Sequence, residues 1–145
     1  MTQIQKMPEL LAPAGGMEQL RAALRYGADA VYGGMKHYGL RAFAGNFGPE
    51  ELREAVALCH QMGRKFYVTM NIFPFDDQLP GFIEAARDAA KAGVDAAIVS
   101  DLGAICVLRE QVPELPKEAP APAQPQTPPA KFIRIRAPSG SFVSA

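Results

Sequence analysis

A glycine that ends an amphipathic segment, followed within a few residues by an apolar run, recurs along this chain. The glycines are Gly27, Gly63 and Gly93, spaced 36 and 30 residues apart, and Asp29 and Asp95 follow the first and third at the same offset. A repeat of this length suits a strand–helix unit, because parallel strands must be joined by a crossover that is usually helical. The pattern therefore predicts an α/β fold with a parallel sheet.

Four strand–helix units account for residues 1–116. Short apolar or β-branched runs predict the strands, and apolar residues at helical spacing, bounded by Gly or Pro, predict the helices. The predicted strands are 9–14, 30–34, 65–71 and 96–101, and the predicted helices are 17–26, 49–62, 79–92 and 102–111. Because the units match the roughly 31 residues per repeat of an eightfold barrel of about 250 residues, we expect half of a TIM-type barrel.

The main alternative is a doubly wound open sheet, in which helices cover both faces of the parallel strands. Such a sheet commonly binds a dinucleotide through a G-x-G-x-x-G turn after its first strand. The glycine pairs Gly15-Gly16 and Gly33-Gly34 lack that spacing, and no helix directly follows the second pair. Pairs of this kind are typical of tight turns at strand ends, so the half-barrel is the favoured interpretation.

Residues 117–145 differ in composition from the rest of the chain. They hold six of the 13 prolines and carry a net charge of +3 within a chain of net charge 0, so residues 1–116 carry −3. A stretch rich in Pro, Ala and Gln favours extended conformers and buries too little apolar surface to offset the entropy of ordering. We expect a disordered basic tail. Residues 131–137 alternate briefly like a strand, but no partner for them is evident.

The overall composition excludes several classes of protein. Zero net charge gives no general attraction to nucleic acid or to an anionic membrane, and no apolar run approaches the roughly 18 residues of a membrane span. The N-terminus does not resemble a secretory signal, so we expect a cytoplasmic protein. Cys59 and Cys106 are the only cysteines and lie at apolar positions of predicted helices, which predicts buried free thiols and no metal site.

Polar residues that follow the predicted strands are the candidates for a binding site, because a barrel of this kind binds its ligands at the carboxyl ends of its strands. Lys36 and Arg41 have the charge to hold a phosphate or carboxylate, and Asn46 and Asn71 offer amide groups. Asp101 could orient a ligand, although an Asp between a strand and a helix is more often an N-cap. No H-E-x-x-H or G-x-S-x-G pattern occurs, so no catalytic residue is assigned.

Five segments of the chain closely resemble the start of peptidase family U32 proteins, in the same order and with similar spacing. They are Pro-Glu-Leu-Leu-Ala-Pro-Ala-Gly-Gly (8–16), Tyr-Gly-Ala-Asp-Ala-Val-Tyr (26–32), Arg-Ala-Phe-Ala-Gly-Asn-Phe (41–47), Tyr-Val-Thr-Met-Asn (67–71) and Val-Ser-Asp-Leu-Gly (99–103). The resemblance covers about residues 8–116 and includes Arg41 and Asn46. It implies an N-terminal domain like a TIM barrel. It also implies either the family's traditional role, collagenase-like proteolysis, or support for hydroxylation of RNA bases or ubiquinone precursors.

The chain also departs from that family. Members normally continue into a strand with a His-x-Ser-x-Gln-like segment and a later cysteine-bearing signature, and several bind an iron–sulfur cluster through such cysteines. Two cysteines cannot supply the four ligands of a cluster, so we expect no cofactor in this chain. The abrupt change near residue 116 suggests a truncated form, in which a frameshift or a recombined gene has replaced the continuation with the basic tail.

Two hypotheses about function therefore stand side by side. The first is a protein related to U32 peptidases, with a peptide or RNA substrate implied by the resemblance alone. The second is a catalytically inactive half-barrel that acts only by associating with another chain. Open sheet edges and uncovered apolar faces favour self-association, so we expect residues 1–116 to form oligomers or a partly molten state.

Overall fold

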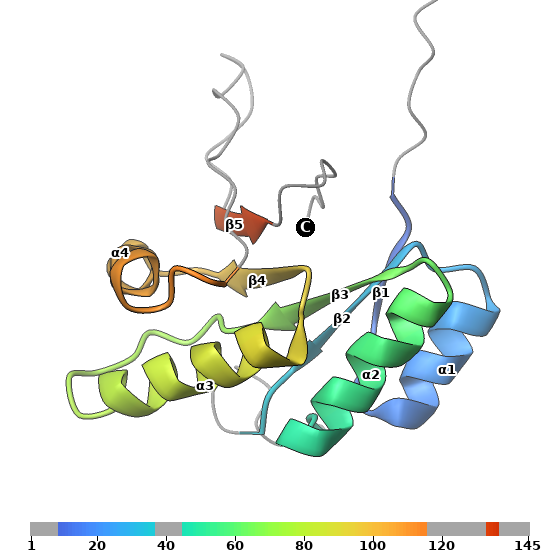
Figure 1. The fold of residues 1–145 in the computed structure, drawn as a ribbon, viewed down its shortest axis with the longest axis horizontal. Helices are drawn as coiled ribbons and strands as arrows, with labels where there is room; N and C mark the ends of the chain where they lie inside the picture. Colours follow the sequence, from blue (N-terminus) through green and yellow to red (C-terminus); the bar gives the residue numbers. More distant parts are fainter. Residues whose placement is uncertain (1–8, 37–44, 116–132, 137–145) are drawn as a thin grey trace, which may run out of the picture.

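A computed structural model describes residues 9–36, 45–115 and 133–136. Four strand–helix units follow one another along the chain, and a separate strand follows them (Figure 1). The first two units are β1 (Leu11–Pro13), α1 (Met17–Arg25), β2 (Ala30–Gly34) and α2 (Pro49–Gln61). The others are β3 (Lys65–Thr69), α3 (Leu79–Ala92), β4 (Ala96–Val99) and α4 (Leu102–Gln111), before β5 (Ile133–Arg136). The predicted α/β fold of four units is confirmed.

The strands form one sheet in the order β1-β2-β3-β4-β5. The first four are parallel and pair in sequence order, with Val31 of β2 opposite Phe66 of β3 and Val68 of β3 opposite Ala97 of β4. Neighbouring strands in sequence are thus neighbours in the sheet, as in a barrel, and each crossover carries a helix.

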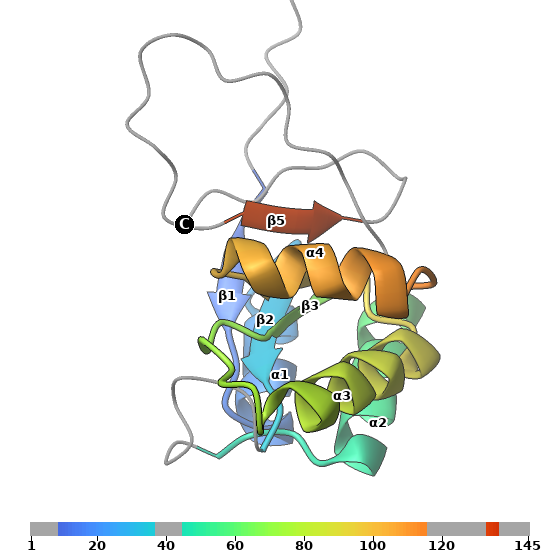
Figure 2. The same ribbon diagram turned by 90° about the vertical axis from the view of Figure 1, so that its left-hand side faces the viewer.

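The helices all pack on one face of the sheet (Figures 1 and 2). Alternate strand residues such as Val31, Phe66 and Val99 belong to one buried cluster with apolar residues of all four helices. A doubly wound sheet would place helices on both faces, so this arrangement supports a partial barrel. The opposite face carries a smaller cluster centred on Ala30, Tyr67 and Ala96.

The repeated glycines have the conformation that their position requires. Gly27, Gly63 and Gly93 follow α1, α2 and α3, and they are the residues with positive φ in the described part of the chain, at 90°, 66° and 81°. Glycine adopts this left-handed conformation without the steric cost that a Cβ would bring. The repeat seen in the sequence is therefore a repeat of helix-ending turns.

The aspartates that follow two of these glycines also repeat a structural role. Asp29 accepts a hydrogen bond from the backbone N–H of Leu10 at 2.9 Å, and Asp95 accepts one from Phe66 at 2.8 Å. Each aspartate also donates its own backbone N–H to the carbonyl oxygen of the same partner residue. Each Asp thus fastens the start of its own strand to the neighbouring strand.

The fifth strand corrects one expectation from the sequence. The sequence suggests no partner for the alternating segment in the tail, yet Ile133–Arg136 pairs antiparallel with all four residues of β4. Such pairing depends on an edge that becomes available only after the sheet has formed, which local periodicity does not reveal. The rest of the predicted disordered tail lies outside the described residues.

Candidate functional site

The carboxyl end of β2 brings a predicted site residue against the neighbouring strand. The backbone N–H of Phe47 donates to the carbonyl oxygen of Gly34 at 3.0 Å, which holds the preceding residue, Asn46, beside β2. A Cβ atom added to Gly34 would lie 2.8 Å from Asn46 Oδ1 and 3.2 Å from Thr69 Oγ1. The absence of a side chain at Gly34 therefore makes room for the Asn46 amide close to the Thr69 hydroxyl.

A second pair of polar residues lies at the ends of β3 and β4. Thr69 is in register with Ile98, and the backbone N–H of Met70 donates to the Ile98 carbonyl oxygen at 2.9 Å. Asn71 and Ser100 each follow two residues later, and side chains two residues apart in a strand share a face. Asn71 and Ser100 therefore extend the row that holds Thr69.

The hydroxyl of Ser100 is the one buried side-chain oxygen or nitrogen in the described residues that has no hydrogen-bond partner there. Burying a hydroxyl without a partner costs free energy, on the order of 1–3 kcal/mol. An unsatisfied group of this kind at the ligand-binding end of a sheet is a candidate contact for a bound molecule. We call Asn46, Thr69, Asn71 and Ser100 the strand-end cluster.

Lys36 is engaged at the start of α2. Its Nζ lies 3.6 Å from Glu51 Oε2, which also accepts the backbone N–H of Gly48 at 2.8 Å. The hydrogen bond from Gly48, and next the positive charge of Lys36, lower the pKa of Glu51 below its usual value of 4.5. Lys36 thus supports a helix start, and its predicted role in ligand binding stays a prediction.

Asp101 is the N-cap of α4. Its carboxylate accepts the backbone N–H of Ala104 at 3.0 Å and that of Gly103 at 3.4 Å. The cap that the sequence favours for this residue is confirmed. The cap engages both carboxylate oxygens, Oδ1 with Gly103 and Oδ2 with Ala104.

Arg41 lies outside the described residues, so its role in ligand binding stays a prediction. Of the other four predicted site residues, Asn46 and Asn71 belong to the strand-end cluster, whereas Lys36 and Asp101 serve helix starts. Sequence reasoning missed Thr69 and Ser100. Strand alternation could have found both, since each stands two residues from another inward position of its strand.

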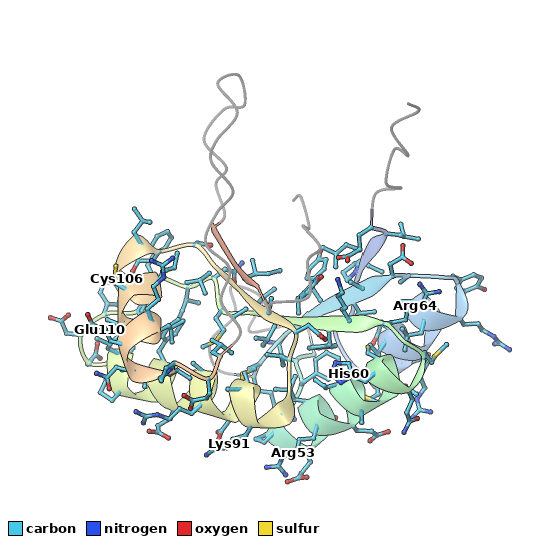
Figure 3. All side chains as sticks on the ribbon, turned by 45° about the horizontal axis from the view of Figure 1, so that its top comes forward. Arg53, His60, Arg64, Lys91, Cys106 and Glu110 are labelled. Atoms are coloured by element: carbon cyan, nitrogen blue, oxygen red, sulfur yellow. The ribbon has the colours of Figure 1, made fainter. Side chains whose placement is uncertain are left out.

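The cysteines show one confirmed and one wrong prediction. Cys59 is buried, and burial followed by the negative charge of Asp95 raises the pKa of its thiol to about 12. Cys106 is exposed, because the buried side of α4 consists of Ala104, Ile105 and Leu108. Figure 3 shows Cys106 and Glu110 on the outer side of this helix. The described residues contain no group of three or more His, Cys, Asp or Glu side chains that could hold a metal ion.

The outer surface of the helices is balanced in charge. Four ion pairs lie on it, and Figure 3 labels two of their basic members, Arg53 and Lys91, on this surface. The pairs are Arg21–Glu54, Arg53–Glu50, Arg87–Glu84 and Lys91–Asp88. Pairs of this kind leave little net positive charge for phosphate binding. The strand-end cluster, made of uncharged amides and hydroxyls, is therefore the better candidate site.

None of the helices in the described ranges has both the length and the apolar character needed to cross a membrane. The fold itself resembles that of a solved structure, the U32 peptidase Mk0906, with a TM-score of 0.55 and 17% sequence identity. The match covers 74% of this chain and 48% of that protein. The likeness supports the partial-barrel fold.

Comparison with known sequences identifies relatives of two kinds. The chain is 44% identical over 109 residues to tRNA hydroxylation protein P of Escherichia coli, covering 75% of this chain and 24% of the relative. It is 36% identical over 103 residues to a collagenase of Porphyromonas gingivalis, covering 70% of this chain and 25% of the relative. The chain thus spans about a quarter of the length of these relatives. Residues 15–124 match the sequence profile of peptidase family U32, and this chain is a member of that family.

Proposed function

We propose that this chain supplies the base-binding part of a protein that supports hydroxylation of tRNA. The observation that carries the proposal is the strand-end cluster, in which Asn46, Thr69, Asn71 and Ser100 offer uncharged donors and acceptors. A nucleobase presents a similar mixture of donors and acceptors along its edge, and amide side chains pair with such edges well. The similarity to a protein named for tRNA hydroxylation favours this ligand.

The described residues favour binding over nucleophilic catalysis. The Cys59 thiol is buried and has a pKa of about 12, so almost none of it is a thiolate at neutral pH. His60 contacts Asp95 at 2.9 Å on the surface of α2, and Ser100 has no hydrogen-bonded base among the described residues. A nucleophile needs such a base or a lowered pKa. Peptide hydrolysis is therefore the second candidate, kept because one relative is named a collagenase.

The proposal assigns the chain one part of a longer process. Because the chain spans about a quarter of its relatives, we assign it recognition of the base and leave the oxidation step to other groups. An iron–sulfur cluster in full-length relatives would need ligands beyond Cys59 and Cys106. A cytoplasmic location, where tRNA is found, belongs to the same proposal.

This function is tested by titrating the whole chain with a short unpaired oligouridine while recording the backbone amide chemical shifts by NMR. We expect shifts concentrated at residues 46, 69–71 and 100, and affinity reduced about tenfold in Ser100→Ala, the equivalent of ~1.4 kcal/mol. Removing the Ser100 hydroxyl breaks no hydrogen bond among the described residues, so we expect this variant to keep its fold. Glu110→Gln, on the exposed side of α4, is the matched control and should bind like the parent chain.

Two results would contradict this assignment. If shifts appear on the helix layer with Ser100→Ala unchanged, the RNA binds elsewhere. If a collagen-derived peptide shifts the strand-end cluster and the oligouridine does not, the peptidase candidate is favoured.

A further inference from the structure

The edge of β4 is closed by a strand that differs from all others in the sheet. β5 is antiparallel where the first four strands are parallel, and it pairs with β4 along that strand's whole length, from Ala96 opposite Arg136 to Val99 opposite Ile133. Figure 1 shows β5 beside β4 at the end of the sheet. It also lies beyond residue 124, where the match to family U32 ends. The segment that closes the edge thus comes from outside the matched region.

Without β5, β4 would be a strongly association-prone edge. Its sequence is Ala-Ala-Ile-Val, with no charged residue, no Pro and no Gly. Natural edge strands are usually protected by charged residues, Pro, bulges or a covering element. β4 has none of the sequence-based protections, so its unpaired N–H and C=O groups would form a template for another strand.

β5 itself has the composition of a terminal edge. Two of its four residues, Arg134 and Arg136, are arginines, and charge on an edge strand disfavours further pairing. It pairs with β4 through four residues only. A strand held by so short a ladder can act as a removable cover.

We propose that Ile133–Arg136 is a displaceable cap on the β4 edge, and that the uncapped edge pairs with β4 of a second copy of this chain. The ladder that β4 already forms with β5 is antiparallel, and two copies of one strand related by a two-fold axis perpendicular to the strand are also antiparallel. Such an interface is self-complementary and closes at a dimer. The cap and the second copy compete for the same backbone groups.

A pair of proline substitutions removes the cap. In an antiparallel ladder alternate residues point their N–H groups at the partner strand, so Arg134→Pro/Ile135→Pro removes a donor facing β4 whichever residue carries it. Arg134→Lys/Ile135→Val keeps both N–H groups and the charge, and serves as the matched control. Molar mass is measured by light scattering over a wide range of concentrations, with hydrogen exchange at Ala97 and Ile98.

At physiological salt and a pH well above 6.7, we expect the parent and the control to stay monomeric, with slow exchange in β4, at concentrations where the proline variant dimerises. At high dilution the proline variant should exchange rapidly in β4 and regain protection as it dimerises. A labelled peptide of residues 131–138 should bind the proline variant, return it to monomer, and bind the parent weakly.

Three results would overturn the proposal. One is a proline variant that stays monomeric at every concentration while its β4 amides exchange rapidly. Another is unchanged exchange in β4, which would mean that β5 does not cover that edge. The third is a parent chain that already dimerises as strongly as the variant. Hydrogen exchange in α1–α3 reports whether each variant is folded. Binding of the labelled peptide of residues 131–138 to the folded parent tests whether β5 can be displaced, even if the proline variant does not fold.

Discussion

The two cysteines differ in reactivity because they lie on opposite sides of their helices. Cys59 packs in the main core with a pKa raised to about 12, chiefly by burial, whereas Cys106 is exposed on α4. We expect a thiol reagent at pH 8 to modify one cysteine in the folded chain and two in denaturant. Cys106→Ser should abolish the reaction of the folded chain, while Cys59→Ser should leave it intact. Rapid modification of Cys59 under native conditions would contradict the packing described here.

The aspartates after the repeated glycines act at the scale of whole elements, because each connects two neighbouring strands. Asp95 Oδ2 accepts the backbone N–H of Phe66 at 2.8 Å and lies 2.9 Å from His60 Nε2. Asp95→Ala would leave the Phe66 N–H unsatisfied where Phe66 itself is fully buried, a loss of about 1–3 kcal/mol. Urea unfolding should show this decrease in the free energy of unfolding.

Asp95→Asn is the matched control, since its amide oxygen can still accept the backbone N–H. We expect it to recover most of the loss. Equal destabilisation by the two substitutions would mean that the charge, and not the backbone hydrogen bond, stabilises the junction of β3 and β4.

The start of α2 gives an expected pH dependence. The folded-state pKa of Glu51 is lowered by the Gly48 N–H and by Lys36, so its ionised form stabilises the fold. This contribution is fully present above the ordinary pKa of 4.5 and is lost as the pH falls through the lower folded value. Glu51→Gln should therefore be less stable than the parent at pH 7, with the gap closing below about pH 4.5. In a Lys36→Ala background, the loss of stability caused by Glu51→Gln should be smaller. A loss that does not depend on pH would refute the stabilising role of ionised Glu51.

The elements also show what the sequence could and could not predict. The strand 30–34 and the helices 79–92 and 102–111 have the predicted bounds, because Gly, Pro and apolar spacing act locally. The strands predicted at 65–71 and 96–101 end two residues earlier, at Thr69 and Val99, because apolar periodicity does not fix where pairing with a neighbouring strand stops. The pairing of β5 with β4 and the lack of a hydrogen-bond partner for the Ser100 hydroxyl among the described residues could not be predicted, since both depend on contacts between distant parts of the chain.

At the scale of the whole molecule, removal of the tail has two opposing effects on self-association: it increases electrostatic repulsion between copies, and it exposes the β4 edge. The full chain has zero net charge and an isoelectric point near 6.7, whereas residues 1–116 carry −3. Low net charge promotes association near the isoelectric point. At physiological ionic strength, salt largely screens the repulsion between exposed charges that are more than about 8 Å apart. The tail therefore lowers electrostatic repulsion while its strand β5 covers the β4 edge.

Salt separates these two forces in a chain that ends at residue 116. We expect the full chain to associate near pH 6.7 at low salt and to dissociate as salt is added, because charge attraction causes that association. The shorter chain should have its solubility minimum at lower pH, and its self-association at neutral pH should strengthen with salt, because salt screens the repulsion while the strand pairing remains. Sedimentation velocity at low and high salt distinguishes the two behaviours. A shorter chain that is monomeric in high salt would show that β4 does not need its cover, and that the tail affects association through its charge alone.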